Sequence, residues 1–224
     1  MISIALIERS LDQQDHDRLL RDLAGNGLTL PLPLRMQLCD SSTAVRGLAL
    51  RRLVELTYGP TARSRELTLQ LIQAVHGFAD EADPTAADPA SLPDVLTLAA
   101  ALAALAQVES DQPAAIDEHL TRALELGLRR LAGQQDCDGL FTGPRDRSLG
   151  DRALTTAFIL SLVGSCPRFT QQLRLPELYG WFDQRDGRLD RHTQQLWDLA
   201  CIGLQGSADP AALTHPESQP GLAA

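Results

Sequence analysis

The chain has no lysine, so all 20 of its basic residues are arginines, and 29 acidic residues outnumber them. The formal net charge is −9 at pH 7. Sequence-independent binding of nucleic acid depends on basic side chains that neutralise phosphates. Because the chain is acidic and contains no basic run, it is a poor candidate for a nucleic-acid-binding protein.

Cysteines and long apolar runs are also scarce. The four cysteines are widely spaced and form no Cys-x-x-Cys pair, which argues against a disulfide framework. The longest apolar run, residues 98–106, is well short of the roughly 20 residues that span a bilayer. Residues 1–9 lack the basic region and the longer apolar stretch of a signal peptide. We therefore expect no membrane span and a cytoplasmic protein.

Apolar residues recur at helical spacing along most of the chain, and no stretch shows the two-residue alternation of a strand. The stretch 94–107 is apolar on nearly all sides, which predicts a central helix. Pro31 and Pro33 predict an extended segment, and the acidic, proline-rich stretch 80–93 predicts a loop. The expected helices cover residues 11–24, 42–58, 63–78, 94–107, 113–132 and 146–163, then one starting at Pro176 and one over 193–204.

Two predicted helix junctions share a glutamine followed closely by Asp-Gly. They contain Gln135 with Gly139 and Gln184 with Gly187, and the two glycines lie 48 positions apart. That distance suits a helix pair with its loops, and a period of this size indicates stacked helical hairpins. The glycine supplies the left-handed conformation that ends a helix. The aspartate can accept turn amides, and the glutamine can hold a neighbouring helix end.

The sequence thus predicts an all-α protein built from antiparallel helical-hairpin repeats. Residues 1–206 are expected to form a single domain, with the repeats clearest over 65–205. Residues 207–224 are rich in proline, serine, alanine and glycine, which is typical of a disordered tail.

The first junction resembles the QW repeat of the terpene cyclase and protein prenyltransferase superfamily. In that repeat a small residue and an aromatic–aliphatic pair precede Gln and Gly-x-Trp. Gln135 and Gly139 match, whereas Arg130 replaces the aromatic residue and Phe141 replaces tryptophan. A third, degenerate copy begins at His76. The resemblance implies a partial α/α toroid whose inner helices line a cavity. The second copy offers Tyr179, Gln184 and Gly187, with Leu189 in place of tryptophan.

The catalytic motifs of that superfamily are incomplete here. Neither Asp-x-Asp-Asp nor Asp-Asp-x-x-Asp occurs, and Asp138 belongs to the nearest match, inside the first junction. The resemblance implies zinc bound by Asp-x-Cys and a later His. Asp151 lies where that pair would fall, with no cysteine two residues later, and His192 matches the later element. Cys137 is the candidate replacement thiolate. A catalytic zinc needs three protein ligands and an open position.

Candidate catalytic residues are therefore Asp151, His192 and Asp138, and candidate metal ligands are Asp151, His192 and Cys137. The leading expectation is nevertheless a protein without cofactor, metal or enzymatic activity. Aromatic residues make up only 4% of the chain, whereas a cyclase stabilises cationic intermediates with an aromatic cavity. The aromatic residues of interest are either local core or a partner or pocket surface, and they are Tyr179, Trp181, Trp197 and Phe141.

Three functions remain open at this point. The first is a non-catalytic helical-repeat binding or scaffold protein. About eight helices would leave a toroid incomplete and its apolar inner surface uncovered, so we expect a protein partner or a homodimer. The second is a prenyltransferase- or terpene-cyclase-like enzyme with an isoprenoid substrate. The third is an apolar small-molecule carrier, which requires Leu98, Leu102 and Leu105 to face a void.

Overall fold

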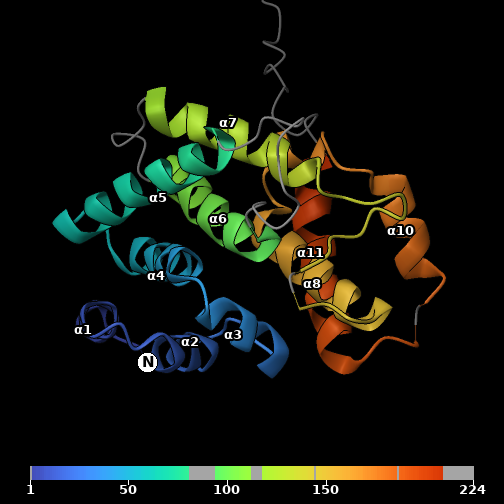
Figure 1. Ribbon diagram of the computed structural model, residues 1–224, viewed down its shortest axis with the longest axis horizontal. Helices are drawn as coiled ribbons and strands as arrows, with labels where there is room; N and C mark the ends of the chain where they lie inside the picture. Colours follow the sequence, from blue (N-terminus) through green and yellow to red (C-terminus); the bar gives the residue numbers. More distant parts are fainter. Residues whose placement is uncertain (1, 81–93, 112–117, 144, 186, 209–224) are drawn as a thin grey trace, which may run out of the picture.

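A computed structural model describes residues 2–80, 94–111, 118–143, 145–185 and 187–208 of the chain (Figure 1). Over these ranges the protein consists of eleven helices and contains no strand, which confirms the all-α class. The helices are α1 (Ile4–Asp12), α2 (His16–Ala24), α3 (Leu32–Cys39), α4 (Ser42–Leu56), α5 (Ala62–Asp80), α6 (Val95–Asp111), α7 (Glu118–Ala132), α8 (Leu149–Val163), α9 (Pro167–Thr170), α10 (Leu175–Asp183) and α11 (Arg191–Ala208).

The N-terminal part differs from the prediction. The helix expected over 11–24 begins only at His16, because Asp15 caps α2 by accepting a hydrogen bond from an amide of its first turn at 3.2 Å. A separate helix that was not predicted, α1, precedes it. Gln14, between them, has a φ of 54°. The prolines also act differently. Pro31 is extended, as expected, but Pro33 lies in the first turn of α3, where the N–H it lacks would have had no partner in the helix.

The later helices begin and end within a few residues of the predicted positions, except for the short α9, which was not predicted. Ser41 caps α4 and Ser148 caps α8, each by accepting an amide of the first turn. The predicted start of the fifth helix at Pro113, the loop over 81–93 and the tail from 209 lie outside the described residues. The last helix, α11, runs to Ala208, two residues into the expected tail.

The central position predicted for the apolar helix is confirmed, because α6 lies in the middle of the molecule, with α4, α5, α7 and α8 packed around it (Figure 1). Twelve of its residues are buried. Its alanines allow close approach: a methyl group added at Gly47 of α4 would lie 2.6 Å from the carbonyl oxygen of Ala100. Leu102 packs against Gly127 of α7. A methyl group added at Gly127 would lie 2.5 Å from Cδ2 of Leu102.

The packing around α6 answers one question raised by the sequence. Leu98, Leu102 and Leu105 are all fully buried in the same hydrophobic core. Leu102 therefore meets a packed neighbour, Gly127, on one side. Gly77 lies inside α5, so the described part of the degenerate third repeat contains no helix junction. No helix in the described ranges combines the length and the apolar character needed to cross a membrane.

Candidate functional site

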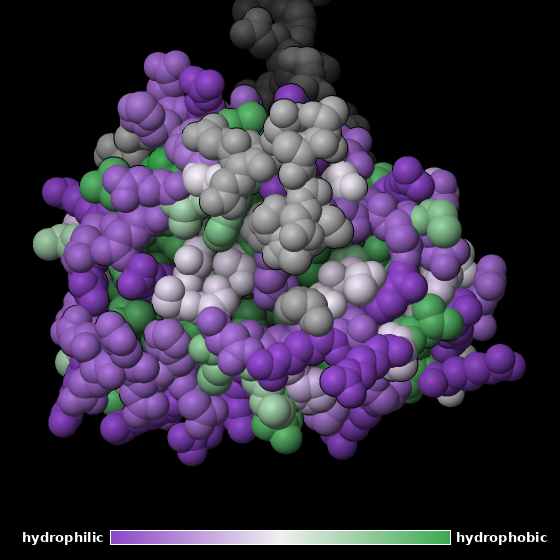
Figure 2. All heavy atoms as spheres, viewed as in Figure 1, coloured by the Kyte–Doolittle hydropathy of each residue, from purple (hydrophilic) through white to green (hydrophobic). Residues whose placement is uncertain are grey.

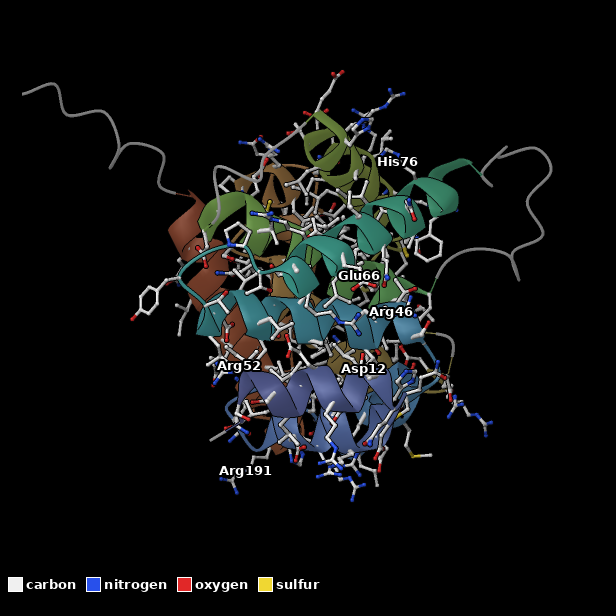
Figure 3. All side chains as sticks on the ribbon, turned by 90° about the vertical axis from the view of Figure 1, so that its left-hand side faces the viewer. Asp12, Arg46, Arg52, Glu66, His76 and Arg191 are labelled. Atoms are coloured by element: carbon white, nitrogen blue, oxygen red, sulfur yellow. The ribbon has the colours of Figure 1, made fainter. Side chains whose placement is uncertain are left out.

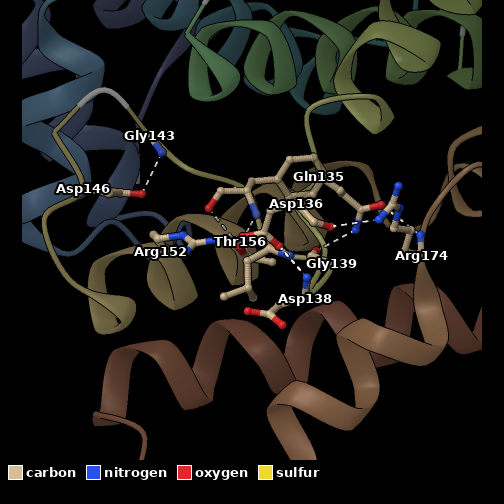
Figure 4. Close-up of polar contacts among 11 residues, drawn as sticks. Gln135, Asp136, Asp138, Gly139, Gly143, Asp146, Arg152, Thr156 and Arg174 are labelled. Atoms are coloured by element: carbon tan, nitrogen blue, oxygen red, sulfur yellow. Dashed lines mark hydrogen bonds and ion pairs between the residues drawn. The ribbon is translucent and has the colours of Figure 1, made fainter.

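The first glutamine junction follows α7 in the chain and contacts the N-terminus of α10 through a side chain. Gln135 is buried, and its Nε2 donates to the carbonyl oxygen of Gly139 at 2.7 Å. Its Oε1 accepts the backbone N–H of Arg174 at 2.9 Å (Figure 4). Gly139 has a φ of 77°, and a methyl group there would lie 3.0 Å from the backbone nitrogen of Leu178. Glutamine and glycine therefore together hold α10 against the junction, as the sequence predicted for these residue types.

Asp136 closes the turn itself. Its Oδ1 accepts the amides of Asp138 and Leu140, each at 2.9 Å, while its other oxygen pairs with Arg152 of α8. After the turn the chain enters the core. Phe141 is buried there, and its amide donates to the hydroxyl of Thr156 at 2.9 Å. The aspartate that accepts the turn amides is thus the one directly after the glutamine, rather than the aspartate of the Asp-Gly pair.

The second junction is only partly similar. Gly187 has a φ of 72°, close to that of Gly139, but a methyl group added there would meet nothing within 4 Å. Gln184 is exposed and caps the C-terminus of α10 with its backbone. Its aspartate, Asp186, lies outside the described residues. The two junctions therefore share the backbone turn, whereas the glutamine tie belongs to the first.

The candidate catalytic residues have local structural roles. Asp151 forms a capping box with Ser148 at the start of α8, and the Ser148 hydroxyl and neighbouring amides lower its pKa by hydrogen bonding. His192 lies in the first turn of α11 with its side chain 60% exposed and its Nδ1 3.8 Å from Asp190. Cys137 and Asp138 are exposed in the first junction. Among the described residues, no three His, Cys, Asp or Glu side chains are grouped to hold a metal ion.

Three of the four predicted aromatic residues come together in the C-terminal hairpin. Trp197 of α11 stacks on Phe182 of α10 at 3.9 Å between ring centroids, and Tyr179 meets Trp197 edge-on at 5.7 Å. Trp181 contacts Phe182 on its other side and carries the guanidinium of Arg185 4.1 Å from its ring centroid. The fourth is elsewhere, because buried Phe141 stacks on Phe169. Both tryptophans are buried, so this cluster is mainly the core between α10 and α11.

A buried polar joint connects α3, α6 and α8. Asp146 accepts the amide of Gly143 at 2.7 Å and the hydroxyl of Thr155 at 3.1 Å, and Gln37 of α3 donates to it at 3.4 Å. Asp94 lies close by and caps α6 through the amide of Leu96 at 3.0 Å. Burial raises the pKa of Asp94, and the negative charge of Asp146 raises it further. The carboxylates here are used to fix the helices.

A cleft that the sequence did not reveal lies between α1, α4 and α5. It has a volume of about 430 Å³ and is mostly polar; we call it the α1–α4–α5 cleft. Arg63 crosses it, with one nitrogen 2.8 Å from Asp12 of α1 and another 2.7 Å from Glu66. Figure 3 shows Asp12, Arg46 and Glu66 on this side of the molecule, each from a different helix. The remaining lining residues are Leu11, Gln14, His16, Ser42, Leu67 and Gln70.

Arg46 is the distinctive residue of this cleft. It is half-buried on α4, and its side chain makes no hydrogen bond or ion pair with any described residue. The nearby carboxylates of Asp12 and Glu66 are both paired with Arg63. At the rim, Gln14 is the one described non-glycine residue with a positive φ. The pair of Arg63 and Glu66 three residues apart was the only sequence signal here, and it is typical of any exposed helix.

Scans against protein-family models, curated proteins and solved structures gave no match for this chain. The geometry of the described residues is therefore the basis for a functional proposal.

Proposed function

We propose that this protein is a non-catalytic helical binding module that holds a short, acidic peptide segment of a partner protein in the α1–α4–α5 cleft. One observation carries the proposal: Arg46 lines the cleft half-buried, and no described residue pairs with it. A guanidinium in this position presents N–H donors in a fixed planar fork that matches a carboxylate. Its charge is partly withdrawn from water without a protein partner, which a bound carboxylate would supply.

The other groups of the cleft favour a peptide over a simple anion. Asp12 uses one carboxylate oxygen on Arg63, whereas Glu66 uses one on Arg63 and the other on Gln70 at 3.1 Å. The acceptor positions that remain are therefore chiefly those of Asp12. These acceptors would repel a compact anion but suit the amide N–H groups of a peptide main chain. A ligand with both a carboxylate and amide donors therefore matches both kinds of group. The volume of about 430 Å³ is within the range of roughly 300–1,000 Å³ that is typical of ligand sites.

The proposed relation to the terpene cyclase and prenyltransferase superfamily rests on the first junction, where Gln135 and Gly139 hold a following helix. The enzymatic alternative has less support. An enzyme of this kind would need Asp151 and His192 in one cavity, with the carboxylate of Asp151 free to act. Asp151 instead accepts hydrogen bonds from Ser148 and Arg147 within its own helix cap.

The test is a selection of short peptides from a random library on the purified full chain, followed by fluorescence anisotropy on the selected peptides. Three proteins are compared: the wild type, Arg46→Gln, and Arg65→Gln as a control at an exposed position of the neighbouring helix α5. We expect the selected peptides to carry Asp or Glu. Arg46→Gln should weaken their binding by about ten- to a hundredfold, because it removes a hydrogen bond to a charged group. Arg65→Gln should leave the binding unchanged. Peptides without acidic residues, or binding that survives Arg46→Gln, would contradict the proposal.

A further inference from the structure

A second hollow, on another side of α4, lies between the C-terminal ends of α6 and α8. We call it the α6–α8 hollow; it has a volume of about 360 Å³ and includes Arg51 of α4 in its wall. Arg51 also lines an adjoining hollow of about 220 Å³ beside α2. Much of the remaining wall is apolar and is formed by Ala103, Ala106, Leu162, Val163 and Pro167.

The ion pairs around this hollow leave one arginine in excess. Glu109 is paired with Arg168 at 3.0 Å. Glu55 lies 2.7 Å from a terminal nitrogen of Arg52 but 3.7 Å from Nε of Arg51. Each glutamate therefore has a close arginine partner, and Arg51 keeps only the longer contact. Arg51 and Glu109 are the charged residues of the wall, and because Glu109 is closely paired with Arg168, the charge of Arg51 is the less compensated of the two.

Arg51 is also withdrawn from water. Its side chain is 28% exposed, and burial lowers the pKa of its guanidinium. Next to it, Nε of Arg52 is buried without a hydrogen-bond partner among the described residues. Partly buried cationic groups that lack close partners are unfavourable, and an anion that reaches them gains stronger contacts than it would in water.

We propose that the α6–α8 hollow binds a small aliphatic carboxylate, with its head group on the guanidinium of Arg51 and its chain along the wall formed by α6 and α8. The carboxylate matches the planar fork of arginine. The apolar wall contacts the hydrocarbon chain, which inorganic phosphate does not have. The volume lies near the lower end of the range for ligand sites, which favours a short ligand. This proposal is independent of peptide binding in the α1–α4–α5 cleft.

Isothermal titration calorimetry with hexanoate tests the proposal on the full chain. Hexanol has the same chain without the charge, and inorganic phosphate has charge without the chain. We expect saturable binding of hexanoate at one site per chain. Hexanol should bind at least about tenfold more weakly, because it cannot form the hydrogen bond between charged groups. Phosphate should also bind more weakly, because it has no chain to contact the apolar wall. Absence of saturable hexanoate binding by the wild type at millimolar concentrations would overturn the proposal.

Variants assign the binding to this hollow. Arg51→Gln should weaken hexanoate binding by at least about tenfold, whereas Glu55→Gln should strengthen it because Arg51 loses its competing carboxylate. Arg65→Gln, at an exposed position of α5, should bind hexanoate like the wild type. Ala106→Leu fills the hollow without altering a charge, and it should abolish binding even if Arg51→Gln does not fold. Hexanoate affinity that is unchanged in Arg51→Gln or in Ala106→Leu would refute the assignment.

Discussion

The crossing of α4 over α6 is set by Gly47, and a single methyl group there tests the packing of the whole molecule. In Gly47→Ala the new Cβ would lie 2.6 Å from the carbonyl oxygen of Ala100 and 3.0 Å from the nitrogen of Ala101. Ordinary van der Waals contact begins at 3.4 Å, so the two helices must separate by about 0.8 Å. The obstructing atoms belong to the backbone, and no rotation of a side chain can relieve the contact.

Two opposing effects determine the size of the change. Alanine is favoured over glycine inside a helix by roughly 0.5–1 kcal/mol. Overpacking of a well-packed core costs about 1–3 kcal/mol. Because the contact at Gly47 involves rigid backbone on a helix that is buried along most of its length, we expect the upper part of that range to apply. The net loss should be about 2 kcal/mol, which corresponds to a fall in Tm of about 4–8 °C for a chain of this length.

The matched control is Gly77→Ala in α5. This glycine is also inside a helix, but a methyl group added there meets nothing within 4 Å. We expect the control to gain roughly 0.5–1 kcal/mol from helix propensity alone. Urea denaturation followed by circular dichroism measures both free energies of unfolding. If Gly47→Ala is as stable as Gly77→Ala, the close approach of α4 and α6 is not present and the reasoning is wrong.

Two further predictions concern the first junction and the buried polar joint. Gly139→Ala and Gly187→Ala both place alanine in a left-handed conformation, which costs about 1–2 kcal/mol. Only the methyl group at position 139 also meets the backbone of α10, so Gly139→Ala should lose more free energy of unfolding in urea denaturation. Equal losses in the two variants would argue against docking of α10 on this glycine. Burial raises the pKa of Asp94 in the folded state, so the stability that it contributes is present below the ordinary aspartate pKa and is lost as the pH rises through the raised value. Asp94→Asn keeps a capping oxygen and cannot ionise. Its free energy of unfolding should therefore rise relative to that of the wild type between about pH 4 and pH 7. A constant difference between the two proteins across this range would show that Asp94 is not desolvated.

Most helices from α4 onward could be predicted closely from the sequence, because their signals are local; the short α9 is the exception. Ser41 and Ser148 cap the helices that follow them, and the apolar pattern over 94–107 correctly placed α6 at the centre. The break between α1 and α2 could not be read in the same way. Residues 11–24 keep helical spacing throughout, and the capping by Asp15 competes successfully with continuation of the helix.

The candidate sites were less accessible from sequence than the fold. The pattern pointed to Asp151 and His192, whose surroundings are local caps at two helix starts. It grouped Tyr179 with the tryptophans correctly, but it missed Phe182, whose ring contacts those of both Trp181 and Trp197. A residue type and its spacing identify a helix cap or a turn, whereas the partners of a side chain depend on which helices meet.

The sequence by itself determined the all-α class, the buried central helix and the glycine turn at Gly139, because periodicity, composition and backbone conformation act over a few neighbouring residues. Only the tertiary structure decided which arginines face hollows. Arg46 and Arg51 lie on the same helix and look alike in sequence, yet α1 and α5 form the cleft around the first, while α6 and α8 form the hollow around the second. Those surroundings come from helices far apart in the chain, and packing alone brings them together.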